Sequence, residues 1–319
     1  MKRILLIQTA FIGDVILATA LIEELHILYP DAKIDILLRK GAEGLFAGHP
    51  FIGDVLVLDK SRSKWTQLWK LLWRIRKKHY DLLVNCQRFA SSGFLSAFSG
   101  AGRISGFRKN PFSRLFTHRY PHEIGNGQHE VERNRLLISF LSPQKACNPR
   151  LYPPALDWAP SAPYICIAPA SVWFTKQWPL HKWIELVSLI PDNTSVYLLG
   201  SGADHALCEK IIRESARANV INLSGKLNLL QSATLMKGAR MNYVNDSAPL
   251  HLCSAVNAPV KAIFCSTVPG FGFGPLSDQS SIVEIPAPLY CRPCGLHGYK
   301  ACPEGHFRCA EEIDARQAI

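Results

Sequence analysis

The sequence has no apolar run long enough to cross a lipid bilayer. A membrane-spanning helix needs about 18–20 uninterrupted apolar residues, and none of the apolar stretches reaches that length. The sequence also lacks short-period repeats and low-complexity tracts. Apolar residues nevertheless make up 48% of the 319 positions, and the mean hydropathy is near zero. These features exclude a disordered chain and disfavour a polytopic membrane protein.

The N-terminus resembles a secretory signal peptide only in part. A basic pair precedes an apolar stretch, and Ala18-Thr19-Ala20 resembles a cleavage site. However, Gln8 and Asp14 interrupt the apolar core, and the order of residues is more typical of a strand, a tight loop and a helix. We therefore expect a cytoplasmic protein, whose ten cysteines are free thiols or metal ligands rather than disulfides.

Acidic residues are scarce in the first half of the chain. Residues 1–150 hold 23 Lys and Arg against 12 Asp and Glu, whereas residues 151–319 hold 13 of each. The whole formal net charge of +11 therefore belongs to the first half. We expect any acidic partner to meet that half.

Alternating strand and helix patterns predict an α/β protein. A length of 319 residues fits two domains of about 150 residues each. In the first half, short β-branched runs alternate with amphipathic segments, which is typical of a parallel, doubly wound sheet. The expected strands are Arg3–Ile7, Lys33–Leu38, Val55–Leu58 and Leu82–Cys86, and the expected helices are Asp14–Tyr29 and Ser63–His79.

A proline-rich linker separates two such patterns. Residues 148–163 contain five prolines, which prevent both a helix and a central strand. We expect an N-terminal domain at 1–150 and a C-terminal domain at 151–319, with ligands at the carboxyl ends of both parallel sheets. The second set of expected strands is Tyr164–Ala168, Ser195–Leu199, Val220–Leu223, Asn242–Asn245 and Val260–Phe264, with helices at His181–Leu189, Asp204–Arg217, Leu229–Arg240 and Pro249–Val256.

The loop Ala168–Pro179 has the composition of a phosphate-binding loop. It follows a predicted strand, precedes a predicted helix and offers Ser171, Thr175 and Lys176. Hydroxyl and amide donors with one cation at a helix N-terminus suit a phosphate. The loop lacks the GxxxxGK[ST] pattern, so an ordinary turn with a solvated lysine is the alternative.

The loop Asn245–Leu252 repeats this arrangement at a later strand end. Asp246 or Ser247 can cap the helix expected from Pro249, which leaves backbone N–H groups for an anion. Helix capping alone would also explain both residues. His251 is either a phosphate donor or a buried packing histidine.

Asp14 is the candidate catalytic base. It stands at the start of the first predicted helix, where a carboxylate is also a natural cap. A general base in this position is the functional alternative. Because a helix N-terminus lowers the pKa of a carboxylate, we expect burial or a nearby anion to keep such a base useful.

The predicted helix Ser63–His79 carries tryptophans at every fourth position. Trp65, Trp69 and Trp73 lie among leucines, isoleucine and six basic residues. A basic amphipathic helix with tryptophans is typical of an anionic membrane interface. The alternative, packing against the sheet, suits the leucines better than all three tryptophans.

A cysteine-rich segment lies near the C-terminus. Its cysteines are Cys291, Cys294, Cys302 and Cys309, with His297 and His306 nearby. A structural zinc ion is chemically reasonable, since four cysteines or three and a histidine bind zinc through such short loops. The second cysteine pair lacks CxxC spacing, and free thiols that pack a C-terminal loop are the alternative.

Six segments spread over nearly the whole chain form one recognisable pattern. They are ILLIQTAFIGDVILATALIEELHILYPDAKIDIL, GRISGF, HEVERN, APASVWFTKQWP, LSGKLNLLQSATLMKGARMNYVNDSAPLHL and CRPCGLHGYKACPEGHFRC. Together they resemble the bacterial heptosyltransferases of lipopolysaccharide core assembly, the ADP-heptose-dependent enzymes of glycosyltransferase family 9. The resemblance implies a GT-B fold of two Rossmann-like domains, the N-terminal one binding acceptor and the C-terminal one binding nucleotide-sugar.

The resemblance also assigns roles by position. Asp14 matches the catalytic base, and Asp204 falls where the family places an acidic residue on the nucleotide ribose. The donor-binding positions are Ser171, Thr175, Lys176, Asp204, Asp246, Ser247, Ala248 and His251. Ala170 and Ala248 stand where the family commonly has glycine, so the backbone there approaches a donor less closely. The implied reaction is inverting and needs no metal, because Lys176, hydroxyl groups and helix N-termini stabilise the departing ADP.

A second basic set lies in loop-like sequence of the first half. Its members are Arg88, Arg103, Arg108, Lys109, Arg114 and Arg119. Bidentate arginine suits carboxylates and phosphates. We expect this set, the first four members above all, to bind the acidic sugars and phosphates of a lipid A–Kdo acceptor.

The main prediction is heptose transfer from ADP-heptose to the inner core (Kdo/heptose) of lipopolysaccharide, by an enzyme peripheral on the cytoplasmic face of the inner membrane. One alternative is a family-9 transferase with another nucleotide-sugar or acceptor. Another is a non-catalytic membrane- or nucleic-acid-binding protein, although no RRM, KH or HTH pattern supports nucleic acid as a partner. A Rossmann oxidoreductase is disfavoured because no GxGxxG follows the first strand.

Overall fold

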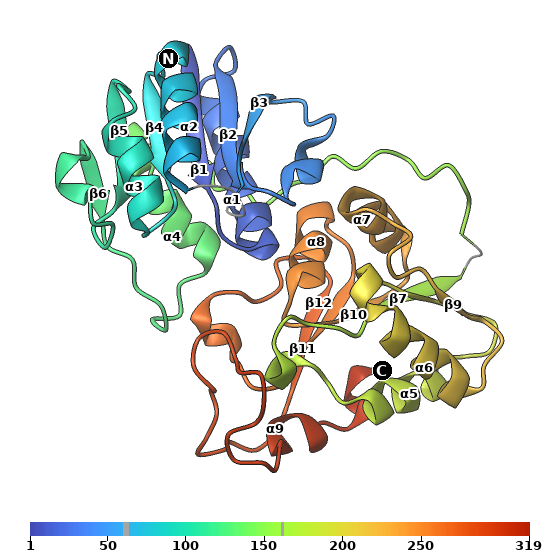
Figure 1. The fold of residues 1–319 in the computed structure, drawn as a ribbon. Coiled ribbons are helices and arrows are strands. Elements are labelled where there is room, and N and C mark those ends of the chain that lie inside the picture. Colours follow the sequence, from blue (N-terminus) through green and yellow to red (C-terminus); the bar gives the residue numbers. More distant parts are fainter. Residues whose placement is uncertain (60–63, 161–162) are drawn as a thin grey trace. The chain divides into compact units, whose positions relative to one another are not determined.

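The chain folds into two compact units. The computed structural model describes residues 1–59, 64–160 and 163–319. The units are Met1–Tyr152 and Pro153–Ile319, so the boundary between them lies within the proline-rich segment. Each unit contains one six-stranded parallel sheet (Figure 1). Ser63 of the predicted second helix and residues 161–162 of the predicted linker lie outside the described residues.

In the first unit the sheet has the order β3-β2-β1-β4-β5-β6. The first strand therefore lies in the middle, with the second strand on one side and the fourth on the other. The strands are β1 (Arg3–Gln8), β2 (Lys33–Arg39), β3 (Ile52–Leu58), β4 (Leu82–Asn85), β5 (Arg103–Phe107) and β6 (His118–Tyr120), and the helices are α1 (Ile12–Leu28), α2 (Lys64–Lys78), α3 (Ala90–Ala97) and α4 (Glu130–Leu136).

Helices cover both faces of this sheet. On one face α1 packs against β1, β2 and α4, and its residues from Val15 to Leu25 are all buried. On the other face α2 and α3 lie side by side (Figure 1). There α2 buries Leu68, Leu72 and Ile75 in one cluster with strand residues such as Leu5. Leucine and isoleucine side chains of α2 thus cover this face of the sheet.

The tryptophans of α2 take no part in that cluster. Trp65, Trp69 and Trp73 point away from the sheet and are 64%, 60% and 59% exposed. The leucines and Ile75 account for the contact with the sheet, and packing therefore does not explain the tryptophans.

In the second unit the sheet has the order β12-β11-β10-β7-β8-β9, again with its first strand in the middle. The strands are β7 (Tyr164–Ala168), β8 (Ser195–Leu198), β9 (Val220–Asn222), β10 (Asn242–Asn245), β11 (Val260–Phe264) and β12 (Ser280–Glu284). The helices are α5 (Leu180–Leu189), α6 (His205–Ser215), α7 (Leu229–Gly238), α8 (Ala248–Val256) and α9 (Arg308–Glu311).

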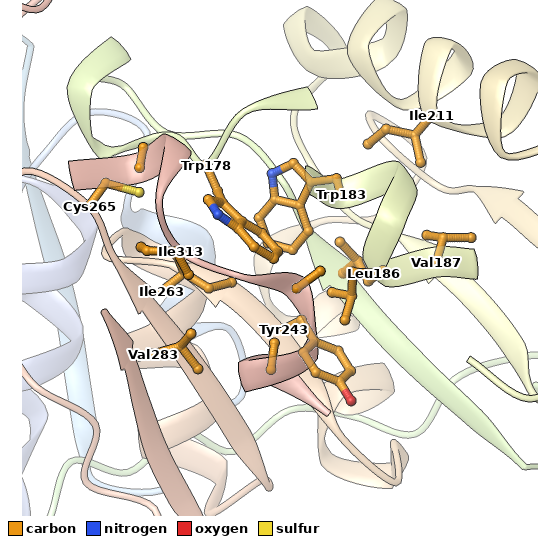
Figure 2. Packing of buried hydrophobic residues seen from close by; sticks show 14 of the residues in the cluster. Trp178, Trp183, Leu186, Val187, Ile211, Tyr243, Ile263, Cys265, Val283 and Ile313 are labelled. Carbon is orange, nitrogen blue, oxygen red and sulfur yellow. The ribbon is translucent and has the colours of Figure 1, made fainter. Parts of the chain in front are cut away.

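Two tryptophans centre the core of the second unit. Trp178 and Trp183 meet edge to face, with ring centroids 5.1 Å apart, and strand and helix residues surround them (Figure 2). Ile313 from the C-terminal segment belongs to the same cluster. Burying two large aromatic side chains here ties the loop after β7 to α5 and to the end of the chain.

The prediction of a parallel α/β chain is confirmed, but several elements were missed. Strands β5, β6 and β12 and helices α3, α4 and α9 were not predicted. The view that the second basic set lies in loops is wrong for two members, because Arg103 begins β5 and Arg119 lies in β6. Both strands are short, and β6 spans only three residues, so an alternating pattern had little room to show. Within the described residues, no helix is both long and apolar enough to span a bilayer.

Candidate active site

Asp14 lies at the carboxyl edge of the first sheet. It is the third residue of α1, the helix that follows the central strand β1. Phe11, at the N-terminal cap position, makes no side-chain capping bond. Next to β1 in the sheet is β4, and the loop after β4 brings Arg88 close enough to act on the charge of Asp14. The strand order reverses between β1 and β4, which is where open α/β sheets bind ligands.

The surroundings of Asp14 raise the pKa of its carboxyl group to about 7. Burial is the largest cause, because removal of water disfavours the charged form, and the negative charge of Glu130 adds to it. Backbone N–H groups of Asp14 and Phe11 and the positive charge of Arg88 oppose the rise. Both conditions that a useful base at a helix N-terminus requires are therefore met. A carboxyl group with this pKa changes its protonation state near neutral pH.

The anion beside Asp14 is held in a buried cluster that the sequence analysis did not identify. Glu130 is buried at the start of α4, and Arg133 Nε donates to its Oε2 over 2.8 Å. His122 Nε2 lies 3.8 Å from the same oxygen. Burial alone would raise the pKa of Glu130, but its contacts with His122 and Arg133 outweigh burial and lower that pKa. The i,i+3 spacing of Glu130 and Arg133 within HEVERN was the available signal.

The structure separates the four predicted acceptor-binding residues. Arg88 follows β4, and Arg108 and Lys109 follow β5, so these three belong to the carboxyl edge. Arg103 instead begins β5 at the opposite edge, where its guanidinium lies 5.4 Å from the centroid of the Phe140 ring. A five-residue strand separates its backbone from that of Arg108 by more than about 10 Å, and acceptor binding by Arg103 stays a prediction.

Three arginines of the second basic set line one pocket. Arg108, Arg114 and Arg119 line an open pocket of about 660 Å³ together with Ser113, Thr117, His118 and Tyr120. No acidic residue belongs to this lining. Three guanidinium groups around one hollow provide bidentate donors for carboxylate or phosphate groups.

In the second unit, the two loops predicted to bind phosphate come together. Lys176, after β7, places its Nζ 2.6 Å from Asp246 Oδ2, after β10. Thr267 also donates to that oxygen, over 2.6 Å. Asn245 ties the same loops, since its Oδ1 accepts from the Trp178 backbone N–H and its Nδ2 donates to the Pro169 carbonyl. Strands β7 and β10 are neighbours at the strand-order reversal of this sheet.

The lysine–aspartate pair changes the role expected for Asp246. A bare carboxylate would repel a phosphate, whereas this carboxylate is engaged by Lys176 and Thr267. The pair is largely buried, with exposed side-chain fractions of 15% and 6%. Asp246 therefore fixes the position of the lysine, and Lys176 is the cation offered at this edge.

Thr175 lies beneath the loop. Its residue is fully buried, and its Oγ1 accepts from the Tyr299 backbone N–H over 2.7 Å and from Ser266 Oγ over 3.0 Å. Gly298 has a φ of 77°, and a Cβ on it would lie 2.8 Å from Thr175 Oγ1. The predicted direct contact of Thr175 with a ligand does not fit this placement, because its hydroxyl joins the loop to the C-terminal segment.

The remaining predicted donor-binding residues occupy different positions around this edge. Ala248 begins α8 after Ser247, and no side chain caps that helix, so its first N–H groups face the loop without a capping side chain. His251 is buried on the same helix. Ser171 is partly exposed in the loop after β7. Asp204 accepts from the Ser201 N–H and hydroxyl, each over 2.7 Å, and thus stabilises the start of α6; ribose binding by Asp204 stays a prediction.

The cysteine-rich segment packs against the loop after β7. Cys294 N donates to the Ser266 carbonyl over 2.8 Å, and the four cysteines line a pocket of about 270 Å³ with His306. Burial raises the pKa of the Cys294 thiol and raises that of Cys309 to about 12. Over the described ranges, no three or more His, Cys, Asp or Glu side chains are grouped so as to hold a metal ion. The four thiols thus lie around one pocket in a packed loop, and a structural zinc ion there stays a prediction.

Comparison with known proteins places the chain in a family. The model of glycosyltransferase family 9 (heptosyltransferase) matches residues 68–297, which is more than half of the chain. The chain belongs to glycosyltransferase family 9. It is 28% identical over 315 residues to lipopolysaccharide heptosyltransferase 1 of Pseudomonas aeruginosa, an alignment that covers 92% of this chain and 86% of that protein. The protein is therefore a glycosyltransferase of the heptosyltransferase family.

Solved family-9 structures share the fold. An ADP-heptose lipopolysaccharide heptosyltransferase II of Escherichia coli superposes with a TM-score of 0.80 at 23% identity, covering 100% of this chain and 96% of that one. An E. coli heptosyltransferase with bound ADP-2-deoxy-2-fluoro heptose gives 0.73 at 20% identity, covering 89% and 93%. The two-sheet architecture is thus the GT-B-like fold of these glycosyltransferases, as predicted.

The pKa of Asp14 provides a direct test of this site. In protein labelled with ¹³C at the aspartate carboxyl carbon, the Asp14 resonance, identified by its loss in Asp14→Asn, should titrate with a midpoint at about pH 7. Glu130→Gln should lower that midpoint, because removal of the adjacent negative charge makes ionisation of Asp14 easier. Exposed Glu123→Gln serves as the matched control and should leave the midpoint in place. A midpoint near 4 in the parent protein would contradict this account of the site.

Proposed function

We propose that the protein transfers heptose, with inversion, from ADP-heptose to the inner core (Kdo/heptose) of lipopolysaccharide. The observation that carries the proposal is Asp14, a carboxylate at the strand-order reversal of the first sheet with a pKa of about 7. Membership of the heptosyltransferase family supports the reaction class. The relatives named lipopolysaccharide heptosyltransferases and the neighbours with bound ADP or ADP-heptose analogue support the donor and the acceptor.

In the proposed mechanism Asp14 accepts the proton of an acceptor hydroxyl. The hydroxyl oxygen attacks the anomeric carbon, the bond from that carbon to the ADP oxygen breaks, and the configuration inverts. The fraction of Asp14 that is ionised, and so able to accept a proton, grows as the pH rises through about 7. Burial, with a smaller contribution from Glu130, keeps the pKa high, which makes Asp14 a stronger base than an ordinary carboxylate.

The second unit stabilises the leaving group in this proposal. Negative charge grows on the departing ADP, and Lys176 stands where the loops after β7 and β10 meet. The start of α8 adds backbone N–H groups and the positive end of its dipole. These fixed charges supply electrostatic stabilisation of the kind that preorganised sites provide, and we propose that transfer needs no metal cofactor.

The arginine pocket suits the acceptor. An inner-core acceptor carries the carboxylates of Kdo and the phosphates of lipid A, and Arg108, Arg114 and Arg119 surround a hollow of about 660 Å³. All excess positive charge lies in the same half of the chain. Since the acceptor is a glycolipid, we place the enzyme on the cytoplasmic face of the inner membrane as a peripheral protein.

Asp14→Asn tests the assignment of the base. Transfer should fall by about 10²–10⁴-fold, because a general base contributes about that much, whereas ADP affinity should stay the same. The measurement is product formation by mass spectrometry with ADP-heptose and a panel of truncated core acceptors, next to ADP affinity by calorimetry. In the parent enzyme kcat/KM should rise with pH through about 7. Near-normal turnover of Asp14→Asn would contradict the assignment of the base. If the parent enzyme turns over only with another nucleotide-sugar, that compound and not ADP-heptose is the donor.

A second test separates binding from stability at Lys176. Lys176→Met should lower the melting temperature, since it leaves Asp246 buried without its partner, a change that costs up to about 3–5 kcal/mol. The double change Lys176→Met with Asp246→Asn should restore most of the lost melting temperature. Its ADP affinity should remain at least about tenfold weaker than that of the parent, because a charge-assisted bond is lost. Exposed Lys237→Met is the control. Full recovery of ADP affinity in the double variant would show that Lys176 only balances Asp246.

A third test concerns the pocket. Changing Arg108, Arg114 and Arg119 together to Gln should raise the KM for acceptor by at least about tenfold, from the loss of charge-assisted bonds, while ADP affinity stays unchanged. The control with equal loss of charge changes exposed Lys2, Lys33 and Lys145 to Gln. Equal loss of acceptor use in both variants would indicate that net charge, and not the pocket, matters.

A further inference from the structure

Helices α2 and α3 present an aromatic surface to solvent. Trp69 of α2 meets Phe94 of α3 edge-on, with ring centroids 5.5 Å apart, and Phe94 contacts Phe98 at 5.1 Å. Trp65 and Trp73 lie one turn to either side of Trp69 on the same helix. We call these five residues the aromatic face. Three tryptophans are exposed to about 60%, and one of them packs against a neighbouring helix. They form more than scattered surface apolar residues, and such patches mark binding surfaces.

The fold itself does not need this face. The inward side of α2 is complete with Leu68, Leu71, Leu72 and Ile75, each at most 5% exposed. Exposed tryptophans cost solubility and gain nothing for the core of the unit. Their contribution must therefore lie in contact with something outside the unit.

The charges around the face have one sign. Helix α2 holds six basic residues and no acidic one, and the adjoining segment 89–102 holds no charged residue at all. Lys70, Arg74 and Lys77 are exposed along the outer edge, and Lys77 Nζ lies 3.5 Å from the centroid of the Trp73 ring. Asp54, the acid paired with Arg74, is held more closely by Lys78 at 2.6 Å. The face is thus apolar and aromatic with a cationic edge.

We propose that the aromatic face binds an anionic phospholipid bilayer. The indole rings of Trp65, Trp69 and Trp73 would enter the headgroup boundary, which suits side chains with an apolar body and a polar N–H. Lys70, Arg74 and Lys77 would lie over lipid phosphates, each adding to the attraction of the anionic leaflet. The positive charge along this edge, with no acidic residue in α2, complements an anionic lipid surface.

The proposal specifies which surface of the protein meets the membrane. It rests on the proposed function for the source of the lipid. The binding event itself needs neither donor nor acceptor. Its failure can therefore be distinguished from failure of the transferase activity, which is measured on a water-soluble fragment of the acceptor.

Sedimentation with vesicles tests the proposal. The full chain should bind vesicles of phosphatidylcholine with 30% phosphatidylglycerol. It should bind vesicles of phosphatidylcholine alone far more weakly. Changing Trp65, Trp69 and Trp73 together to Ser should weaken binding at least about tenfold, with unchanged transfer to the water-soluble acceptor. The matched control changes three exposed apolar residues elsewhere, Ile27, Leu189 and Ile221, to Ser and should bind as the parent does.

The cationic edge has its own variant. Changing Lys70, Arg74 and Lys77 to Gln should weaken binding to the anionic vesicles about tenfold or more and should reduce its salt dependence. The control with equal loss of charge changes Lys210, Arg213 and Lys237, which are exposed in the second unit, to Gln. Equal weakening by both would overturn the assignment to this edge.

Tryptophan fluorescence locates the contact. All tryptophans of the first unit lie in α2, and buried Trp178 and Trp183 serve as unquenched references. Brominated lipid should quench the parent protein, whereas Trp65, Trp69 and Trp73 changed together to Phe should keep binding and lose the quenching. The proposal would be overturned if the parent protein did not bind vesicles or if the Ser variant bound them equally well. It would also be overturned if the parent were a dimer that the Ser variant turned into a monomer, because the aromatic face would then bind a second copy of the chain.

Discussion

The reversal of strand order beside the first strand of each sheet is the constraint on which the rest of this molecule depends. In the first unit β1 lies between β2 and β4, and in the second β7 lies between β8 and β10. The loops that follow the two adjacent strands must leave the carboxyl edge toward opposite faces, which opens space for a ligand. Asp14 and Lys176 occupy the equivalent position, each in the loop or first turn after the first strand of its sheet.

The two edges use charge in opposite ways. At the first edge a carboxylate is desolvated and placed near Glu130, so that its pKa lies near neutrality and it can exchange a proton. At the second edge a lysine is held by Asp246 and Thr267, so that its charge is fixed in position. A proton acceptor needs two accessible protonation states, whereas a phosphate site needs a permanent cation held in place. In the proposed roles, one doubly wound architecture therefore suits both purposes, and the electrostatic surroundings of each edge make the difference.

Residues remote in sequence support the loop after β7. The backbone of Tyr299 bonds Thr175, and Gly298 approaches the same hydroxyl too closely for a side chain. The cysteine-rich segment that contains these residues also contributes Phe307 and Cys309 to the core of the second unit. It is a structural brace for the loop after β7.

The sequence by itself determined the two parallel α/β units, their proline-rich boundary and the family, because strand and helix periodicity and long motifs are local properties of the chain. It also singled out Asp14 and Lys176 as candidate site residues, because both follow first strands. Tertiary structure alone decided which groups surround them. Glu130 acts on Asp14 across a packed helix pair. Asp246, seventy residues further along the chain, pairs with Lys176, and Arg103 begins β5 at the edge opposite to Arg108. Burial and charge depend on neighbours in space, and spacing along the chain does not encode them.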